Sequence, residues 1–247
     1  DKDPLYPFVV SHIKDSSNSF LLERIRINYR KLIERRIESE KTVITQIPPS
    51  GKQATCSYAE LNAIMRAAFP LIAHFACTTF PELCDLQSNQ KIQLLKHFAI
   101  SLFYLESYNR TSIIYELTDS RRSLTHLTCM DLDNLNDLTF GKEGAIAITY
   151  FRMIRSRSFR PRIIEMNRQF KRLSLSEIEL SSMIALVLSS HECSNMDDTI
   201  ISICKPIKDS VISELNKHYS HSSKDPARNA MRMGDILSFF SEFQVYS

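Results

Sequence analysis

Two long segments of this chain are apolar on almost every side of a helix, and this feature constrains the fold more than any other. Residues 57–79 carry Leu61, Ile64 and Phe75 among their apolar side chains, and residues 92–108 read IQLLKHFAISLFYLESY. A helix of this kind is stable only when neighbouring elements cover its faces. We therefore expect two central helices in one large domain, because 247 residues can bury a core of that size.

Apolar periodicity and serine caps place the other helices. Apolar residues recur every three to four positions in residues 19–41, which predicts an amphipathic helix. The remaining helix starts are predicted from a Ser57–Glu60 capping box, from Ser88, from a Ser176–Glu179 box and from Pro206, with a last helix over residues 227–243. Pro70 is expected to kink the helix that ends near Thr79.

One segment favours β structure. In residues 111–129 two β-branched runs flank a polar DSRRS turn, which predicts a small hairpin. Residues 47–56, IPPSGKQATC, contain two prolines and a glycine and are expected to form a loop. The chain is thus predicted to be an all-α domain with one small hairpin.

Composition and missing motifs exclude several classes of protein. No apolar run reaches the roughly 18 residues that a bilayer span needs, and DKDPLYPF lacks a targeting pattern, so we expect a soluble intracellular chain without membrane contacts. The six cysteines show no paired spacing and are expected to be free thiols. GxGxxG, GxxxxGK, GxSxG and HExxH are absent, and His126 with Cys129, or His191 with Cys193, supplies half a zinc site. We expect no enzymatic activity, metal or other cofactor.

The charge distribution has one local feature. The net charge is +3, but residues 152–172 hold eight basic residues against the single acid Glu165. Such a cluster is typical of a solvated helix face with a loop around Pro161, and an anionic partner is the alternative. The overall charge does not predict nucleic-acid binding.

Residues 80–98, FPELCDLQSNQKIQLLKHF, place a polar SNQK before an apolar pair. This stretch resembles the signature of nuclear receptor ligand-binding domains, approximately F..L...DQ..LLK, with QK where the family has DQ. The matching positions are Leu83, Leu86, Gln90, Lys91, Leu94, Leu95 and Lys96. YRKLIERR resembles helix 1 of the supplementary nematode receptors, which are related to the hepatocyte nuclear factor 4 group. Two further segments match: LSLSEIELSSMIALVLSS resembles helix 8, and RMGDIL resembles the start of helix 10.

The resemblance covers nearly the whole chain and implies a three-layer antiparallel helical sandwich over residues 1–247. It also implies a regulator of transcription in the nucleus that binds a lipophilic, fatty-acid-like ligand and leucine-rich coregulator helices. The four-cysteine zinc modules that bind DNA in such receptors are not found in these residues. DNA contact would therefore belong to another part of a receptor.

Site residues follow from the same resemblance. Alignment with the retinoid X receptor and hepatocyte nuclear factor 4 groups places Arg110 at their ligand-carboxylate arginine, and the other implied ligand residues are Ile64, Ala68 and Phe103. The alternative for Arg110 is pairing with carbonyl groups or with Glu106. The implied coregulator groove contains Thr78, Lys91, Leu95 and Lys96. The implied face for a homodimer or heterodimer contains Arg228, Arg232 and Leu237.

The chain also departs from the family pattern. Thr78 stands where many receptors carry a clamping lysine, and Ser101 replaces the glutamate of receptors that dimerise with the retinoid X receptor, so neither feature is expected here. The residues after Gly234 are too few for helix 11 and the activation helix 12, so no activation helix can be identified. The two alternatives are that these residues are part of a longer receptor and that the receptor lacks this helix. The alternative function is a ligand-independent scaffold for dimerisation or repression, its pocket filled by Phe69, Phe98, Phe103 and Tyr104.

Overall fold

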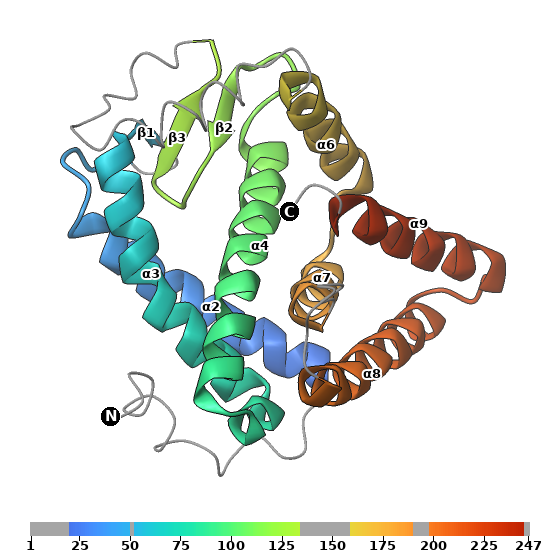
Figure 1. Ribbon diagram of the computed structural model, residues 1–247. Helices are drawn as coiled ribbons and strands as arrows, with labels where there is room; N and C mark the ends of the chain where they lie inside the picture. The colour runs from blue at the N-terminus through green and yellow to red at the C-terminus, as the bar shows by residue number, and fades with distance from the viewer. Residues whose placement is uncertain (1–19, 50–51, 134–158, 190–197, 245–247) are drawn as a thin grey trace. The chain divides into compact units, whose positions relative to one another are not determined.

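The computed structural model describes residues 20–49, 52–133, 159–189 and 198–244 (Figure 1). Most of them are helical, which confirms the predicted all-α class. The described helices are α2 (Leu21–Lys41), α3 (Tyr58–Thr79), α4 (Ser88–Ile114), α6 (Phe159–Leu173), α7 (Glu177–Ser189), α8 (Asp198–Ser222) and α9 (Pro226–Gln244), with a 3-10 turn η1 (Pro81–Asp85). A small sheet consists of β1 (Ala54–Thr55), β2 (Arg121–Ser123) and β3 (Thr128–Asp131).

The chain divides into two compact units. The first comprises Asp1–Ile33, Pro70–Leu102 and Leu175–Ser247, and the second comprises Glu34–Phe69 and Phe103–Ser174. Helices α2, α3 and α4 therefore contribute residues to both units. Helices α7, α8 and α9 belong to the first unit, and the sheet and α6 belong to the second.

In the first unit, α7 packs against both α8 and α9 (Figure 1). Residues 181–189 of α7 are all buried, three serines among them. The hydroxyls of Ser181, Ser182 and Ser189 donate to helix carbonyls four residues earlier, at 2.8 to 2.9 Å. Because each hydroxyl finds a partner on its own helix, α7 can be buried without unsatisfied side-chain oxygens at these positions.

In the second unit, β3 is the central strand of the sheet. It pairs parallel with β1 and antiparallel with β2, and Cys129 lies opposite both Thr55 and Ser123. The Tyr108 ring of α4 stacks on the Phe170 ring of α6 at 5.8 Å, and the Arg122 guanidinium lies over the same tyrosine at 4.0 Å. These contacts join the sheet, α4 and α6 into one core.

Both predicted capping boxes are confirmed. The amide of Glu60 donates to Ser57 Oγ at 3.2 Å, and the amide of Ser57 donates back to the Glu60 carboxylate at 2.8 Å. Ser176 and Glu179 repeat the arrangement ahead of α7, at 3.3 and 2.8 Å. Each box satisfies amides at a helix start, where the helix itself offers no acceptor.

The predicted start of α4 was displaced by one residue. Ser88 is the first helical residue rather than the cap, and the Gln87 carbonyl accepts the first helical hydrogen bond, from the Lys91 amide at 2.9 Å. The Gln87 amide donates to Gln90 Oε1 at 3.1 Å. Gln90 therefore closes the reciprocal contact that a capping box would take from a glutamate.

The predicted hairpin exists, but its boundaries were wrong. Residues 111–114 continue α4, the supposed turn residues 121–123 form β2, and the chain turns back at residues 124–127. Thr111 explains the longer helix, because its hydroxyl donates to the Ser107 carbonyl at 2.7 Å and accepts from the Ser123 amide at 3.0 Å. These contacts outweigh the slight reluctance of β-branched residues to be helical. The predicted loop at residues 47–56 contains β1, a strand that was not predicted.

Pro206 and Pro161 both lie inside helices. A helix was expected to begin at Pro206, and Pro161 was expected in a loop before a helix. Helix α8 starts at Asp198, so Pro206 is an interior residue. Both Pro206 and Ser202, whose carbonyl loses its amide partner, are exposed, and water can satisfy that carbonyl. Pro161 lies in the first turn of α6 rather than in a loop. In a first turn the missing amide costs no helical hydrogen bond.

Helix α3 contains Pro70 and is, by length and composition alone, apolar enough to cross a bilayer. Core helices of globular domains have the same composition. The five described cysteines, Cys56, Cys77, Cys84, Cys129 and Cys204, are free thiols as predicted. Cys193, His191 and the basic residues Arg152, Arg155 and Arg157 lie outside the described residues.

Candidate functional site

A buried ion pair forms the electrostatic centre of the second unit. Arg36 Nη1 donates to both carboxylate oxygens of Glu106 at 2.8 and 2.7 Å, and the side chains are 2% and 0% exposed. Burial is the strongest influence and raises the pKa of Glu106, but attraction by Arg36 and then Arg110 outweighs it and brings this pKa to about 2. Glu106 is therefore a carboxylate that depends on its arginines.

The predicted ligand arginine, Arg110, lies beside this pair. Its Nη2 donates to the Leu124 carbonyl at 2.9 Å, its Nε donates to Ser123 Oγ at 3.2 Å, and its Nη1 lies 3.4 Å from Glu106. These partners, a carbonyl and Glu106, are those of the alternative interpretation. The long contact to Glu106 is the weakest of the three.

The other predicted ligand residues also belong to the second unit. Ile64 and Ala68 are one helical turn apart on α3 and are both buried. Phe103 on α4 is half-buried, and its ring lies 5.7 Å from Tyr104 in an edge-to-face arrangement. Their role as ligand contacts stays a prediction.

Two neighbours of the ion pair, Glu40 and His126, were not predicted as its neighbours from the sequence. Glu40 accepts from the amides of His126 and Leu127 at 3.3 and 2.9 Å, and thus ties α2 to the turn after β2. His126 Nε2 is buried and has no hydrogen-bond partner among the described residues. Burial first, and then repulsion by Arg110, lowers the pKa of His126 from 6.5 to about 3.

A signal for Arg36 and Glu40 was present in the sequence. The buried positions of α2 are Leu21, Leu22, Ile25, Tyr29, Leu32, Arg36 and Glu40. Arg36 and Glu40 thus continue the apolar stripe at three- to four-residue spacing. A charged residue on such a stripe predicts a buried partner, which a search for motifs alone does not find.

The predicted coregulator residues all lie in the first unit and differ in exposure. Lys96 is exposed, Thr78 is half-buried, and Lys91 is buried. Leu95 has no exposed surface, so the chain's own atoms cover it in this conformation. Lys96 and Thr78 are therefore the members of the set that reach the surface.

The predicted dimer residues lie on α9. Arg228 is exposed and Leu237 is half-buried. Arg232 instead binds within the chain: its Nε and Nη2 donate to the two oxygens of Glu179 at 2.6 and 2.8 Å. Tyr219 donates to the same carboxylate at 2.7 Å. Burial raises the pKa of Glu179, but the bonds from Arg232 and its other donors outweigh burial and bring the pKa to about 2.

Comparison with protein families gives a match over most of the chain. The model of the ligand-binding domain of nuclear hormone receptors matches residues 46–247. A comparison of the chain with curated proteins found no match. The matched residues include all the described elements from β1 to α9, and both capping boxes. The chain belongs to the family of nuclear hormone receptor ligand-binding domains.

Proposed function

We propose that this domain binds a lipophilic ligand and converts its occupancy into a change of affinity for coregulator helices in the nucleus. The family match over residues 46–247 carries this proposal. The ligand is a carboxylic lipid, and Arg110 holds its head group. A grouping with the supplementary nematode receptors and the hepatocyte nuclear factor 4 group is part of the same proposal, as is DNA contact through zinc modules elsewhere in a receptor.

The long contact between Arg110 and Glu106 is the observation that supports Arg110 as the lipid anchor. Arg36 takes the short hydrogen bonds to Glu106, and Arg110 approaches that carboxylate only to 3.4 Å. A ligand carboxylate that replaces this long contact gains a charge-assisted bond, and Glu106 keeps Arg36 as its partner. The side chain of Arg110 is 12% exposed, so such a bond is well shielded from water.

Helix α3 is suited to couple ligand to coregulator. It carries Ile64 and Ala68, which we assign to the ligand, and further along it carries Thr78, which we assign to the groove. A ligand can change the groove only if α3 adopts two placements and the ligand binds the domain more tightly in one of them than in the other. Lys96 supplies the exposed cation that meets the end of a leucine-rich helix.

Dimerisation is assigned to α9, with Arg228 and Leu237 in contact with the partner. Arg232 has a second role, because its bonds to Glu179 fix α9 on α7. A change at Arg232 therefore affects the folded monomer as well as the dimer. Arg228→Glu tests the dimer surface with less effect on the monomer.

The ligand-independent scaffold remains the second candidate because aromatic rings fill part of the interior. In the first unit Phe75 contacts Tyr29 edge-to-face at 6.2 Å and stacks with Phe98 at 6.4 Å. Phe98 has no exposed surface. A scaffold of this kind acts through its dimer or through a repressor and binds no lipid.

The experiment is titration of the full chain with palmitate, alongside the variants Arg110→Ala and Arg121→Ala. Arg121 is a matched control, because it belongs to the same unit and is exposed. We expect Arg110→Ala to weaken palmitate binding about tenfold or more, as loss of a charged hydrogen bond does. Equal affinity of both variants and the parent chain would remove Arg110 as the anchor.

A further inference from the structure

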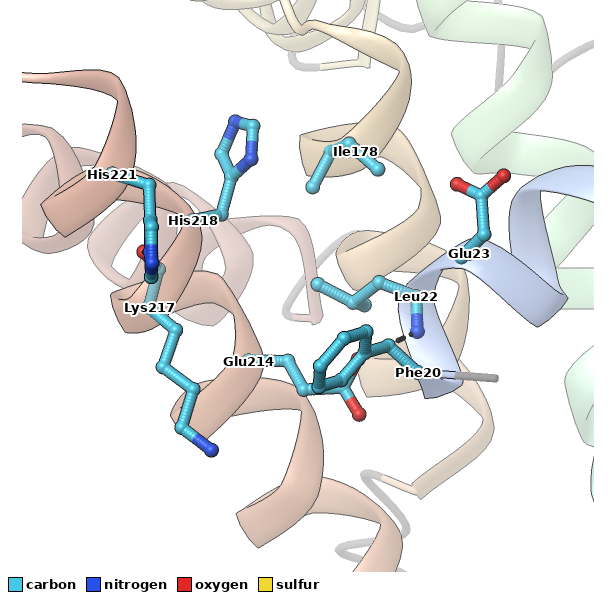
Figure 2. A pocket seen from close by; sticks show the side chains of 8 residues that line it. All are labelled: Phe20, Leu22, Glu23, Ile178, Glu214, Lys217, His218 and His221. Carbon is cyan, nitrogen blue, oxygen red and sulfur yellow. Dashed lines mark hydrogen bonds between the residues drawn. The ribbon is translucent and has the colours of Figure 1, made fainter. Parts of the chain in front are cut away.

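A concave pocket of about 380 Å³ lies in the first unit, at the start of α2 and along α7 and α8 (Figure 2). None of the residues assigned above to ligand, coregulator or dimer lines it. Its size falls within the range of small-molecule sites. The lining residues are Phe20, Leu22, Glu23, Ile178, Glu214, Lys217, His218 and His221.

The pocket has an apolar side formed by Phe20, Leu22 and Ile178 (Figure 2). Phe20 is 70% exposed, so its ring offers apolar surface to a ligand. Burial of that ring and of the Ile178 side chain by a ligand would be favourable. The ligand therefore has an apolar body.

Both carboxylates of the pocket are already bound to the chain. The two oxygens of Glu214 accept from the amides of Leu21 and Leu22 at 2.8 and 2.9 Å, so this side chain caps α2. Glu23 is held by Arg26 through bonds of 2.8 and 2.6 Å. Their charges are offset by a helix N-terminus and by a guanidinium, which reduces repulsion of an anion.

The α8 side of the pocket carries three basic groups at helical spacing, Lys217, His218 and His221 (Figure 2). No ion pair to Lys217 Nζ is present among the described residues. His221 Nδ1 lies 2.6 Å from the Lys217 carbonyl, which can only accept, so Nδ1 carries the proton. The Lys217 ammonium is a cation of the pocket with which a ligand can pair.

We propose that this pocket binds a small amphipathic anion, with its apolar body against Phe20 and Ile178 and its carboxylate on Lys217. Charge complementarity favours this occupant over a neutral or cationic one, since both acids of the pocket are bound to amides or to a guanidinium, and the lysine forms no ion pair within the part of the chain that the structure describes. The pocket shares no residue with the lipid site assigned at Arg110, and either assignment can fail without the other.

The test is a titration of the full chain, labelled with ¹³C at isoleucine methyl groups, with 4-phenylbutyrate. We expect the Ile178 signal to shift to saturation, and Ile64 serves as the reporter for the site near Arg110. 4-Phenylbutanol and 4-phenylbutylamine are the neutral and cationic controls, and both should bind more weakly. An unmoved Ile178 signal, or equal binding of the three compounds, overturns the proposal.

Single-residue variants test which side chains of the pocket bind 4-phenylbutyrate. Lys217→Ala should weaken 4-phenylbutyrate binding about three- to fivefold, the value of a partly exposed charge pair. Lys208→Ala, an exposed lysine of the same helix outside the lining, should leave it unchanged. Phe20→Ala removes apolar surface without disturbing the core, and should weaken binding of the acid and the alcohol alike. Full affinity in Lys217→Ala would overturn the assignment of the carboxylate.

Discussion

Arg36 Nη1 donates to both oxygens of Glu106, at 2.8 and 2.7 Å, and both side chains are almost completely buried. Arg36→Met should lower the free energy of unfolding by about 3–5 kcal/mol, because the buried Glu106 carboxylate loses the guanidinium that offsets its charge. Urea denaturation measures the change. The double variant Arg36→Met with Glu106→Leu should recover much of the loss, since it removes the buried charge.

The exposed pair of Lys41 and Glu38 is the matched control for that experiment. Their nitrogen and oxygen atoms lie 2.6 Å apart, but the side chains are 41% and 72% exposed. Lys41→Met should cost less than about 1 kcal/mol. Similar losses for Arg36→Met and Lys41→Met would contradict the view that burial gives the Arg36 pair its importance.

Stability should depend on pH through His126. The pKa of this histidine is lowered from 6.5 in the unfolded chain to about 3 in the folded chain, first by burial and then by Arg110. Between these values the unfolded state binds more protons, so the free energy of unfolding falls as the pH falls below about 6.5. From pH 7.5 to pH 5 the loss should be about 2 kcal/mol, since each pKa unit corresponds to about 1.4 kcal/mol.

His126→Phe should remove most of this slope, and the exposed His97→Gln should retain it. Urea midpoints at pH 7.5 and pH 5 give the comparison. The low pKa values of Glu106 and Glu179, about 2 in each case, affect stability only as the pH falls through 4.5, so they do not interfere. An unchanged slope in His126→Phe would show that His126 is not the titrating group.

Tyr219 donates to the Glu179 carboxylate, which also accepts from Arg232 and from the Ser176 amide. Tyr219→Phe keeps the ring and removes one hydrogen bond to a charged, buried acceptor. We expect the free energy of unfolding to fall by about 1.5–3 kcal/mol. Ser220→Ala, at the exposed neighbouring position, should change it by less than about 0.5 kcal/mol. Equal effects of the two variants in thermal and urea unfolding would speak against a role for this network in joining α7, α8 and α9.

Pro206→Ala should stabilise the domain. The alanine amide can restore the bond to the Ser202 carbonyl inside α8, which favours the helix, and this outweighs the added freedom of the unfolded chain. The expected gain is about 1–2 kcal/mol. Pro161→Ala, in the first turn of α6, lacks this benefit and should give no comparable gain. A loss of stability in Pro206→Ala would mean that the proline ring makes a packing contact that matters more.

Features set by local chemistry could be predicted from the sequence. The Ser57–Glu60 and Ser176–Glu179 boxes depend on side chains three residues apart, and both formed as expected. The all-α class followed from helical periodicity in the same way. The start of α8 was missed because Pro206 suits a first helical position, whereas the solvent exposure that lets it stay inside a helix depends on the folded chain.

Features set by distant partners could not be predicted. The end of α4 was placed too early because Thr111 is held by Ser123, a contact across the sheet. The partnership of Arg36 with Glu106 joins positions far apart in the sequence, although the place of Arg36 on an apolar stripe was a visible hint. The resemblance to receptors placed Arg110 at a ligand site, but its present partners, Leu124 and Ser123, became visible only in the structure.

Native mass spectrometry of the purified chain, followed by organic extraction, tests the central claim most directly. A ligand-binding domain should carry a co-purified lipid of defined mass that extraction recovers as a fatty acid, and Arg110→Ala should carry less of it. A chain that is uniformly free of lipid, and that takes up none from a mixture of fatty acids, would contradict ligand control and support the scaffold.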